Sequence, residues 1–262
     1  MADVDSASDF RQGMIRRRLG GVRHVLLVLS GKGGVGKSVV SATLAAELAV
    51  SGFVVGLLDA DIYGPSSALL FGIDEVPEEG KGGLTPPTIR GVKIMSVDLF
   101  ASGRPLPLTG YGARQVLLEL LALTDWGKLD CLIVDMPPAT GDIMQLLTSL
   151  GNAKPSGLVV SMPDRLSTAV AHRVLELLRN EKVPAIGVVE NMRRTERSRR
   201  RGAQGPAKLA KEFRVPFLGS LPYDRGVGEA VDRADIGALL KTPFAAELRK
   251  ATLPYKEKLR TD

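Results

Sequence analysis

The sequence is poor in residues that bind metals or form crosslinks. It contains one cysteine, Cys131, and two histidines, His24 and His172, in 262 residues. A single thiol excludes an intrachain disulfide, a CxxC pair and a multi-cysteine metal site within one subunit. His24 opens an apolar run and His172 lies in an expected helix, so we interpret both as structural or solvated.

Long apolar runs are also absent. None approaches the ~20 residues that a helix needs to cross a bilayer, and the start of the chain is too acidic and polar for a secretory signal. We therefore expect a cytoplasmic protein without a membrane span. Its hydrophobic content of 44% suffices for a buried core, and its net charge of +6 permits an acidic partner without requiring one.

Short apolar segments alternate along the chain with helical patterns. We expect strands at residues 24–30, 53–59, 92–97, 130–135, 157–161, 185–189 and 217–220. We expect helices at residues 38–50, 111–123, 166–180, 205–213 and 243–259. Continuous apolar strands are typical of a sheet buried on both faces, and strand–helix alternation indicates right-handed crossovers. The predicted fold class is therefore α/β, a doubly wound, mostly parallel sheet with helices on both faces.

No repeat or Gly/Ser linker divides the chain, so we expect a single domain at residues 21–262. Residues 1–20 are expected to be an N-terminal extension that is partly mobile, because unanchored termini often are. Residues 74–88 are interpreted as a surface excursion. Residues 243–259 carry an apolar face that would suit membrane attachment, but Pro254 interrupts it, and we favour packing on the sheet. That face comprises Phe244, Leu248, Ala251 and Leu259.

The strongest motif is a glycine-rich loop between the first strand and the following helix. Residues 31–38, GKGGVGKS, satisfy the pattern GxxxxGK[ST]. Glycines let backbone N–H groups turn toward phosphate oxygens, and the helix N-terminus adds the positive end of its dipole. Lys37 is expected to reach the β and γ phosphates, and Ser38 to bind Mg²⁺. The candidate nucleotide-binding residues here are Gly31, Lys32, Gly33, Gly34, Val35, Gly36, Lys37, Ser38 and Val39.

Three aspartates follow apolar strands: Asp59, Asp61 and Asp135. In a doubly wound sheet, ligands bind beyond the carboxyl ends of the strands, where all three would lie. One or two of them can hold waters of Mg²⁺, and another can orient the attacking water. The second lysine of the loop, Lys32, is either a solvated side chain or a charge delivered to phosphate across a dimer interface.

The base is expected to be adenine. Guanine selection typically needs an Asn-Lys-x-Asp segment, whose aspartate accepts hydrogen bonds from the guanine base. Glu190, Asn191, Met192 and Arg193 follow the strand expected at 185–189, and this segment lacks that acid.

With these motifs the chain resembles the Mrp/ApbC branch of the deviant Walker A ATPases, which include MinD, ParA and nitrogenase iron protein. The match runs from about residue 20 to 250. Its most branch-specific element is DADIYGPS at residues 59–66. The other matching segments are GKGGVGKS at 31–38, DWGKLD at 125–130, VDMPPATGD at 134–142, VVENM at 188–192 and PFLGSLP at 216–222.

The resemblance implies a homodimer that sandwiches two nucleotides, with Lys32 reaching the ATP of the partner subunit. It implies that Asp61 positions the hydrolytic water, so the catalytic candidates are Lys32, Lys37 and Asp61. Ser38 would bind Mg²⁺, with Asp59 and Asp135 in its outer shell. Relatives of this branch act as ATP-dependent carriers or scaffolds for iron–sulfur clusters. The residues expected at adenine are Asn191, Pro222 and Asp224.

The sequence departs from the family pattern in three places. Val39 and Ala139 stand where the family usually has threonine and glycine, which affects a hydroxyl contact to phosphate and the freedom of the switch loop. The third departure is larger, because cluster carriers have a CxxC pair after the Glu-Asn-Met segment, whereas this chain continues with Arg193. Two buried Cys131 thiols in a dimer fall short of the four that such a cluster normally takes. Cluster binding through the usual CxxC is therefore not expected.

These observations leave several functions open. One is a Mrp-type ATPase switch that acts in iron–sulfur assembly with assembly proteins or through other ligands. Another is a positioning or partition ATPase that binds nucleic acid or an acidic partner through the run from Arg193 to Arg201, six arginines in nine residues. That run is equally compatible with a solvated loop. A third is a nucleotide-binding module with negligible turnover.

Overall fold

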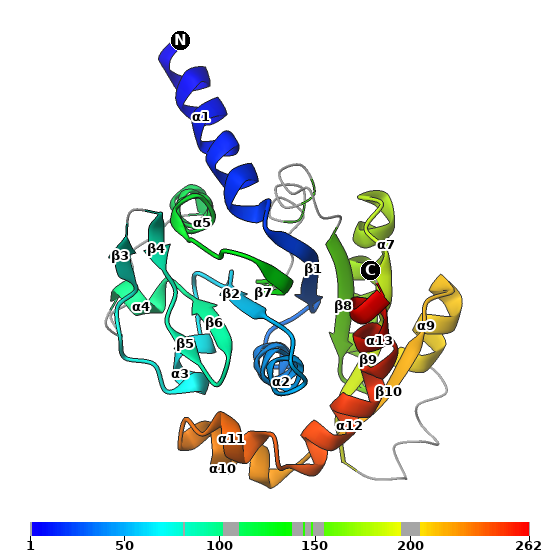
Figure 1. The fold of residues 1–262 in the computed structure, drawn as a ribbon. Coiled ribbons are helices and arrows are strands. Elements are labelled where there is room, and N and C mark those ends of the chain that lie inside the picture. Colours follow the sequence, from blue (N-terminus) through cyan, green and yellow to red (C-terminus); the bar gives the residue numbers. More distant parts are fainter. Residues whose placement is uncertain are drawn as a thin grey trace.

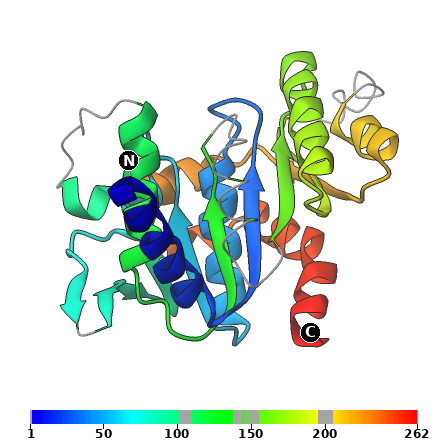
Figure 2. The same cartoon turned by 90° about the horizontal axis from the view of Figure 1, so that it is seen from above.

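The computed structural model describes residues 2–80, 82–101, 110–137, 144, 148, 155–194 and 205–261. Eight strands form one sheet in the order β10-β9-β8-β1-β7-β2-β6-β5, and helices cover both of its faces (Figures 1 and 2). All neighbouring strands of this sheet are parallel except β5 and β6. The predicted doubly wound, mostly parallel α/β class is confirmed.

The strands of the main sheet are β1 Val22–Leu29, β2 Val55–Asp59, β5 Thr88–Ile89, β6 Val92–Met95, β7 Leu129–Asp135, β8 Pro155–Ser161, β9 Ala185–Arg193 and β10 Phe217–Pro222. A separate hairpin pairs β3 Glu78–Gly80 with β4 Gly83–Thr85. The helices are α1 Ala2–Leu19, α2 Lys37–Val50, α3 Ser67–Phe71, α4 Asp98–Ala101, α5 Gly110–Leu123, α7 Arg165–Asn180, α9 Pro206–Phe213, α10 Arg225–Asp232, α11 Ile236–Leu239, α12 Pro243–Ala251 and α13 Leu253–Thr261.

Two apolar layers hold the helices to the sheet. Successive strand residues point to opposite faces, so Leu27 of β1 joins one layer and Leu26 joins the other. The first layer packs under α1, α5, α7 and α9, and the second packs under α2, α11, α12 and α13. Burial on both faces explains why the central strands are continuous apolar runs.

The N-terminal extension contains a helix that the sequence did not predict. It forms α1, whose second half packs along α5 (Figure 1). Ile15 and Leu19 are buried in the first apolar layer, and the guanidinium of Arg11 contacts Gln115 and Glu119 of α5. The second half of α1 is therefore anchored to the domain at residues 21–262.

The expected helix at residues 243–259 is two helices, α12 and α13, which meet at Thr252. Pro254 explains the break, because proline lacks the N–H that would continue the hydrogen-bond ladder. Phe244, Leu248, Ala251 and Leu259 are all buried, which confirms that the apolar face packs on the sheet. No helix in the described part of the chain is both long and apolar enough to cross a membrane.

The surface excursion predicted at residues 74–88 contains the β3–β4 hairpin, and the β3 residues are exposed. Strand β9 continues beyond the predicted end at residue 189, because Arg193 still pairs with Pro222 of β10.

The register of the central strands brings the site residues together. Asp135 lies opposite Val28 of β1 and Asp59 of β2, so the carboxyl ends of β1, β2 and β7 meet at one edge.

Candidate functional site

The loop after β1 has the conformation of a phosphate-binding loop. Gly34 and Gly36 adopt φ values of 77° and 82°, which L side chains rarely adopt. A Cβ atom at Gly33 or Gly34 would meet no atom within 4 Å, so no other part of the chain packs against these two positions. Helix α2 begins at Lys37, and no side chain caps its N-terminus at Gly36. Its first N–H groups therefore remain available to an anion.

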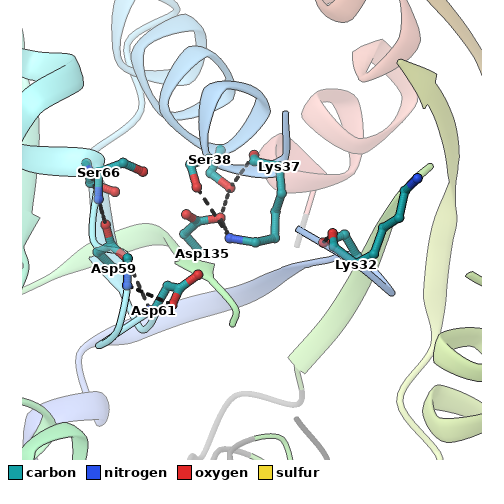
Figure 3. A network of polar contacts seen from close by, with 11 residues as sticks. Lys32, Lys37, Ser38, Asp59, Asp61, Ser66 and Asp135 are labelled. Atoms are coloured by element: carbon teal, nitrogen blue, oxygen red, sulfur yellow. Dashed lines mark hydrogen bonds and ion pairs between the residues drawn. The ribbon is translucent and has the colours of Figure 1, made fainter. Parts of the chain in front are cut away.

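Lys37 and Asp135 form a buried ion pair beneath this loop (Figure 3). Nζ of Lys37 lies 2.6 Å from Oδ1 of Asp135, and the two side chains are 7% and 0% exposed. The hydroxyl of Ser41 donates to the same Oδ1 at 2.8 Å. Oδ2 of Asp135 is buried and has no hydrogen-bond partner among the described residues. Ser38 lies beside the pair, with its Oγ 3.4 Å from Nζ of Lys37.

Asp59 lies next to Asp135 at the end of β2 and is fully buried. Its carboxylate accepts backbone N–H hydrogen bonds from Asp61 at 3.1 Å, Ser66 at 2.8 Å and Ser67 at 2.9 Å. Burial, followed by the charge of Asp135, raises the pKa of Asp59 to about 6, although the N–H donors act in the opposite direction. Asp61 itself is half-buried, and its Oδ1 accepts from the N–H of Gly64 at 3.2 Å.

The side chain of Lys32 points away from Asp59, Asp61 and Asp135 (Figure 3). Its Nζ lies 3.6 Å from Oδ2 of Asp164, the residue that caps the N-terminus of α7. Burial tends to raise the pKa of Asp164, but hydrogen bonds from Ser167 and the nearby Lys32 ammonium lower it overall. The structure therefore places Lys32 at the rim of the site, paired within its own chain.

Of the residues expected at adenine, Asn191 contacts the phosphate-binding loop. Asn191 is buried, and its side-chain amide donates to the carbonyl of Val35 at 2.8 Å. A Cβ atom at Gly36 would lie 2.4 Å from Nδ2 of Asn191, so glycine is needed for this close approach. Asp224 caps α10 by accepting from the N–H of Gly226, and Pro222 ends β10. Asn191 thus contacts the phosphate-binding loop, whereas Asp224 serves a helix terminus.

Two residues of the site were missed in the sequence. Ser41 follows Lys37 by four positions, one helical turn, and that spacing would have placed both on one face of α2. Asp164 precedes Ser167 by three positions, the spacing of an N-cap with the N–H it binds. Ala139 and residues 195–201 of the arginine run lie outside the described residues.

Cys131 and His172 are placed as expected from the sequence. Cys131 is buried in β7, its Sγ lies 3.6 Å from the Tyr255 hydroxyl, and burial raises the pKa of its thiol to about 12. His172 is partly exposed between Glu176 and Glu212. In the part of the chain that the structure describes, no group of three or more His, Cys, Asp or Glu residues is arranged to hold a metal ion.

The arrangement fits a nucleotide with an associated cation. Asp59 and Asp135 place two buried carboxylates beside the buried ammonium of Lys37, which leaves an excess of negative charge. The unpartnered Oδ2 of Asp135 is the kind of acceptor that a hydrated Mg²⁺ uses. The glycine turn and the uncapped α2 N-terminus supply backbone N–H donors for phosphate.

Comparisons with known proteins agree with this geometry. Residues 21–252 match the family profile described as ParA, NUBPL iron-transfer P-loop NTPase. An iron-sulfur cluster carrier protein of Rickettsia felis is 35% identical over 91% of this chain and 70% of its own length. One of Methanococcus maripaludis is 32% identical over 100% of this chain and 94% of its own length. The iron-sulfur cluster transfer protein NUBPL of mouse is 38% identical over 81% and 69%, respectively.

Not all relatives are covered to the same extent. The chain spans 65% of the length of the carrier proteins from Rickettsia typhi and Rickettsia conorii.

Among solved structures, a nucleotide-binding protein from Archaeoglobus fulgidus in complex with ADP has a TM-score of 0.71 and is 30% identical. The match covers 86% of this chain and 92% of that one. MinD from Aquifex aeolicus, with a TM-score of 0.64 and 19% identity over 91% and 97%, shows the same fold. The chain therefore belongs to the ParA family of P-loop NTPases, in the group described as NUBPL iron-transfer NTPases.

Proposed function

We propose that the protein is a Mg²⁺-dependent ATPase switch that works as a homodimer in iron–sulfur cluster assembly. The observation that carries this proposal is the buried Lys37–Asp135 pair beneath the glycine turn, in which Gly34 and Gly36 have positive φ. Lys37 is within reach of two alternative anions, its own carboxylate partner and an incoming phosphate. When Lys37 exchanges the Asp135 carboxylate for a phosphate, the conformational equilibrium of the protein shifts toward the nucleotide-bound state.

The residues of this chain then have distinct tasks. The N–H groups of the glycine turn and of the α2 N-terminus bind phosphate oxygens, and Lys37 neutralises part of their charge. Asp61 accepts a hydrogen bond from the attacking water and orients it. Ser38 and Asp135 would hold Mg²⁺, which when bound supplies charge neutralisation at the phosphates. Asn191 keeps β9 against the loop and reaches adenine from there, next to Pro222 and Asp224.

Lys32 is proposed to leave Asp164 and reach the nucleotide of the partner subunit. Its pair with Asp164 is long at 3.6 Å and partly exposed, with side chains 32% and 43% accessible. Such pairs contribute about 0–1 kcal/mol, so little opposes the exchange. Dimer formation would thereby complete each site.

Turnover by the purified protein tests the ATPase proposal. We expect Mg²⁺-dependent release of phosphate from ATP that falls by about 100-fold or more in Lys37→Ala and Asp61→Asn. Matched controls are Lys128→Ala and Asp232→Asn, both at exposed positions away from the strand ends that carry the site. Equal, near-zero turnover in all five proteins, with and without a dimerising partner, would leave only a nucleotide-binding module.

The proposed role in iron–sulfur assembly rests on family membership. The number of cysteines limits how this chain could take part in it. Cys131 is the single cysteine of the sequence and is buried in a core strand. We therefore propose that ATP-dependent association with assembly proteins, rather than cluster ligation through a CxxC pair, is the contribution of this chain.

A second candidate is an ATPase that holds an acidic surface, as positioning and partition ATPases do. Arg193 and Arg194 line a groove with Ser220, Pro222 and Glu247, and the Arg194 guanidinium lies 4.9 Å from the centre of the Tyr223 ring. Nucleic acid binding that requires ATP and weakens steeply with salt would favour this candidate. Such binding should be lost in Arg193→Glu/Arg194→Glu and kept in Arg173→Glu/Arg179→Glu.

A further inference from the structure

The loop that carries Asp61, residues 60–67, is tied at both ends to one buried carboxylate. Oδ2 of Asp59 accepts from the N–H groups of Ser66 and Ser67, at 2.8 and 2.9 Å. Oδ1 accepts from the N–H of Asp61 at 3.1 Å. Asp59 ends β2, whereas Ser66 and Ser67 lead into α3. A single side chain thus closes the loop into a ring.

Asp61 depends on this loop for its orientation. Its Oδ1 accepts from Gly64 within the loop, and its own N–H is held by Asp59. The N–H of Ala60 donates to the carbonyl of Asp135 at 3.0 Å, which fixes the start of the loop to β7. The Asp61 carboxylate therefore moves only if a bond within this ring opens.

Asp59 and Asp135 differ in how many of their carboxylate acceptor sites are already occupied by hydrogen bonds. An ionised carboxylate offers about four lone-pair sites, and backbone N–H groups occupy three of those on Asp59. On Asp135, Lys37 and Ser41 share Oδ1, while Oδ2 has no partner among the described residues. The acceptor left for a cation thus belongs to Asp135.

We propose that Asp59 is a positioning residue that holds Asp61 where hydrolysis needs it, and not a carboxylate of the magnesium site. This inference rests on the proposed ATPase function. Hydrogen bonds from N–H groups to an ionised carboxylate are roughly twice as strong as neutral ones, and full burial excludes competing water. Loss of these bonds lowers the turnover of bound ATP while leaving the affinities for ATP and Mg²⁺ in place.

The test compares Asp59→Asn with Asp61→Asn. Asparagine keeps the shape of Asp59 but replaces one acceptor oxygen with an amide that cannot accept. We expect kcat of Asp59→Asn to fall by about tenfold or more, with KM for ATP and the Mg²⁺ concentration for half-maximal rate changed less than about twofold. Amide exchange at Asp61, Ser66 and Ser67 should accelerate by about tenfold or more in Asp59→Asn, but not in Asp61→Asn.

Other results would overturn the proposal. A Mg²⁺ requirement that rises by about tenfold, with kcat restored at high Mg²⁺, would assign Asp59 to the magnesium site. Fast exchange of the same three amides in the wild-type protein would also overturn it, whether or not Asp59→Asn folds. A wild-type protein without ATPase activity would refute the proposed function, while the exchange comparison would still decide the role of Asp59 in the loop.

Discussion

Lys37 and Asp135 lie 2.6 Å apart in a fully buried contact between α2 and β7. Each is the main counter-charge of the other, because the second nearby carboxylate, Asp59, is bound to backbone N–H groups. Under the proposed function, a phosphate of ATP competes with Asp135 for the Lys37 ammonium, so nucleotide binding weakens this pair. This relationship links the stability of the fold to the occupancy of the site.

The stability of the pair follows from its burial. Lys37→Met or Asp135→Asn alone should each lower the free energy of unfolding by about 3–5 kcal/mol, because each leaves an uncompensated buried charge. The double variant should lose less than the sum of the two. Urea unfolding at pH 7 without nucleotide measures this, and additive losses would show that the two side chains do not interact.

Substitution of Lys32 should affect ATP turnover more than the stability of the fold. Lys32→Ala is expected to change the free energy of unfolding by less than about 0.5 kcal/mol, since its ion pair is partly exposed. Its ATP turnover should fall by about tenfold or more if the side chain reaches a partner's nucleotide. Mixing Lys32→Ala with a hydrolysis-deficient Asp61→Asn protein and finding no active hybrid site would contradict a role across the interface.

Asp59 makes stability depend on pH. Its pKa is 3.8 ordinarily and about 6 in the folded protein, so between these values the folded state holds a proton that the unfolded chain has released. The stabilising contribution is complete below pH 3.8 and is lost as pH rises through about 6. Relative to Asp59→Asn, the unfolding free energy should decline over this window by at most roughly 3 kcal/mol. A difference that is flat or rises with pH would contradict the assignment.

Much of this arrangement could be predicted from the sequence because it depends on local patterns. Continuous apolar runs identified the central strands, and the glycine loop identified the end of β1. The tie between Asp59 and Ser66 could not be predicted, since it depends on a loop that returns to its own strand. The packing of α1 was missed because Ile15 and Leu19 are too few to form a periodic apolar pattern. Neither contact has a signal in neighbouring residues.

A second ion pair supports the layer of helices around the site. The guanidinium of Arg249 in α12 contacts both carboxylate oxygens of Glu47 in α2, at 2.7 and 2.5 Å. Glu47 is buried, so a double-mutant cycle on this pair should give a coupling of about 1–2 kcal/mol. The exposed pair of Glu247 and Lys250 is the matched control and should give less than about 0.5 kcal/mol. Equal couplings would show that burial of Glu47 does not matter.

The single thiol provides a direct test of whether a cluster can be held. Cys131 is buried, and burial raises its pKa to about 12, so the thiol should not react with a thiol reagent at pH 8 until the protein unfolds. Rapid modification of the native protein would show that Cys131 is accessible. Such access would reopen the possibility that two subunits share it as a ligand.

The measurement that tests the account most directly is anaerobic iron–sulfur reconstitution of the purified protein, with iron and sulfide counted per subunit with and without ATP. The account predicts ATP binding and Mg²⁺-dependent hydrolysis with no stoichiometric iron or sulfide, because Cys131 is the single thiol and is buried. A stoichiometric cluster that transfers to an apo-protein would contradict it and would show that this chain carries clusters through ligands other than a CxxC pair.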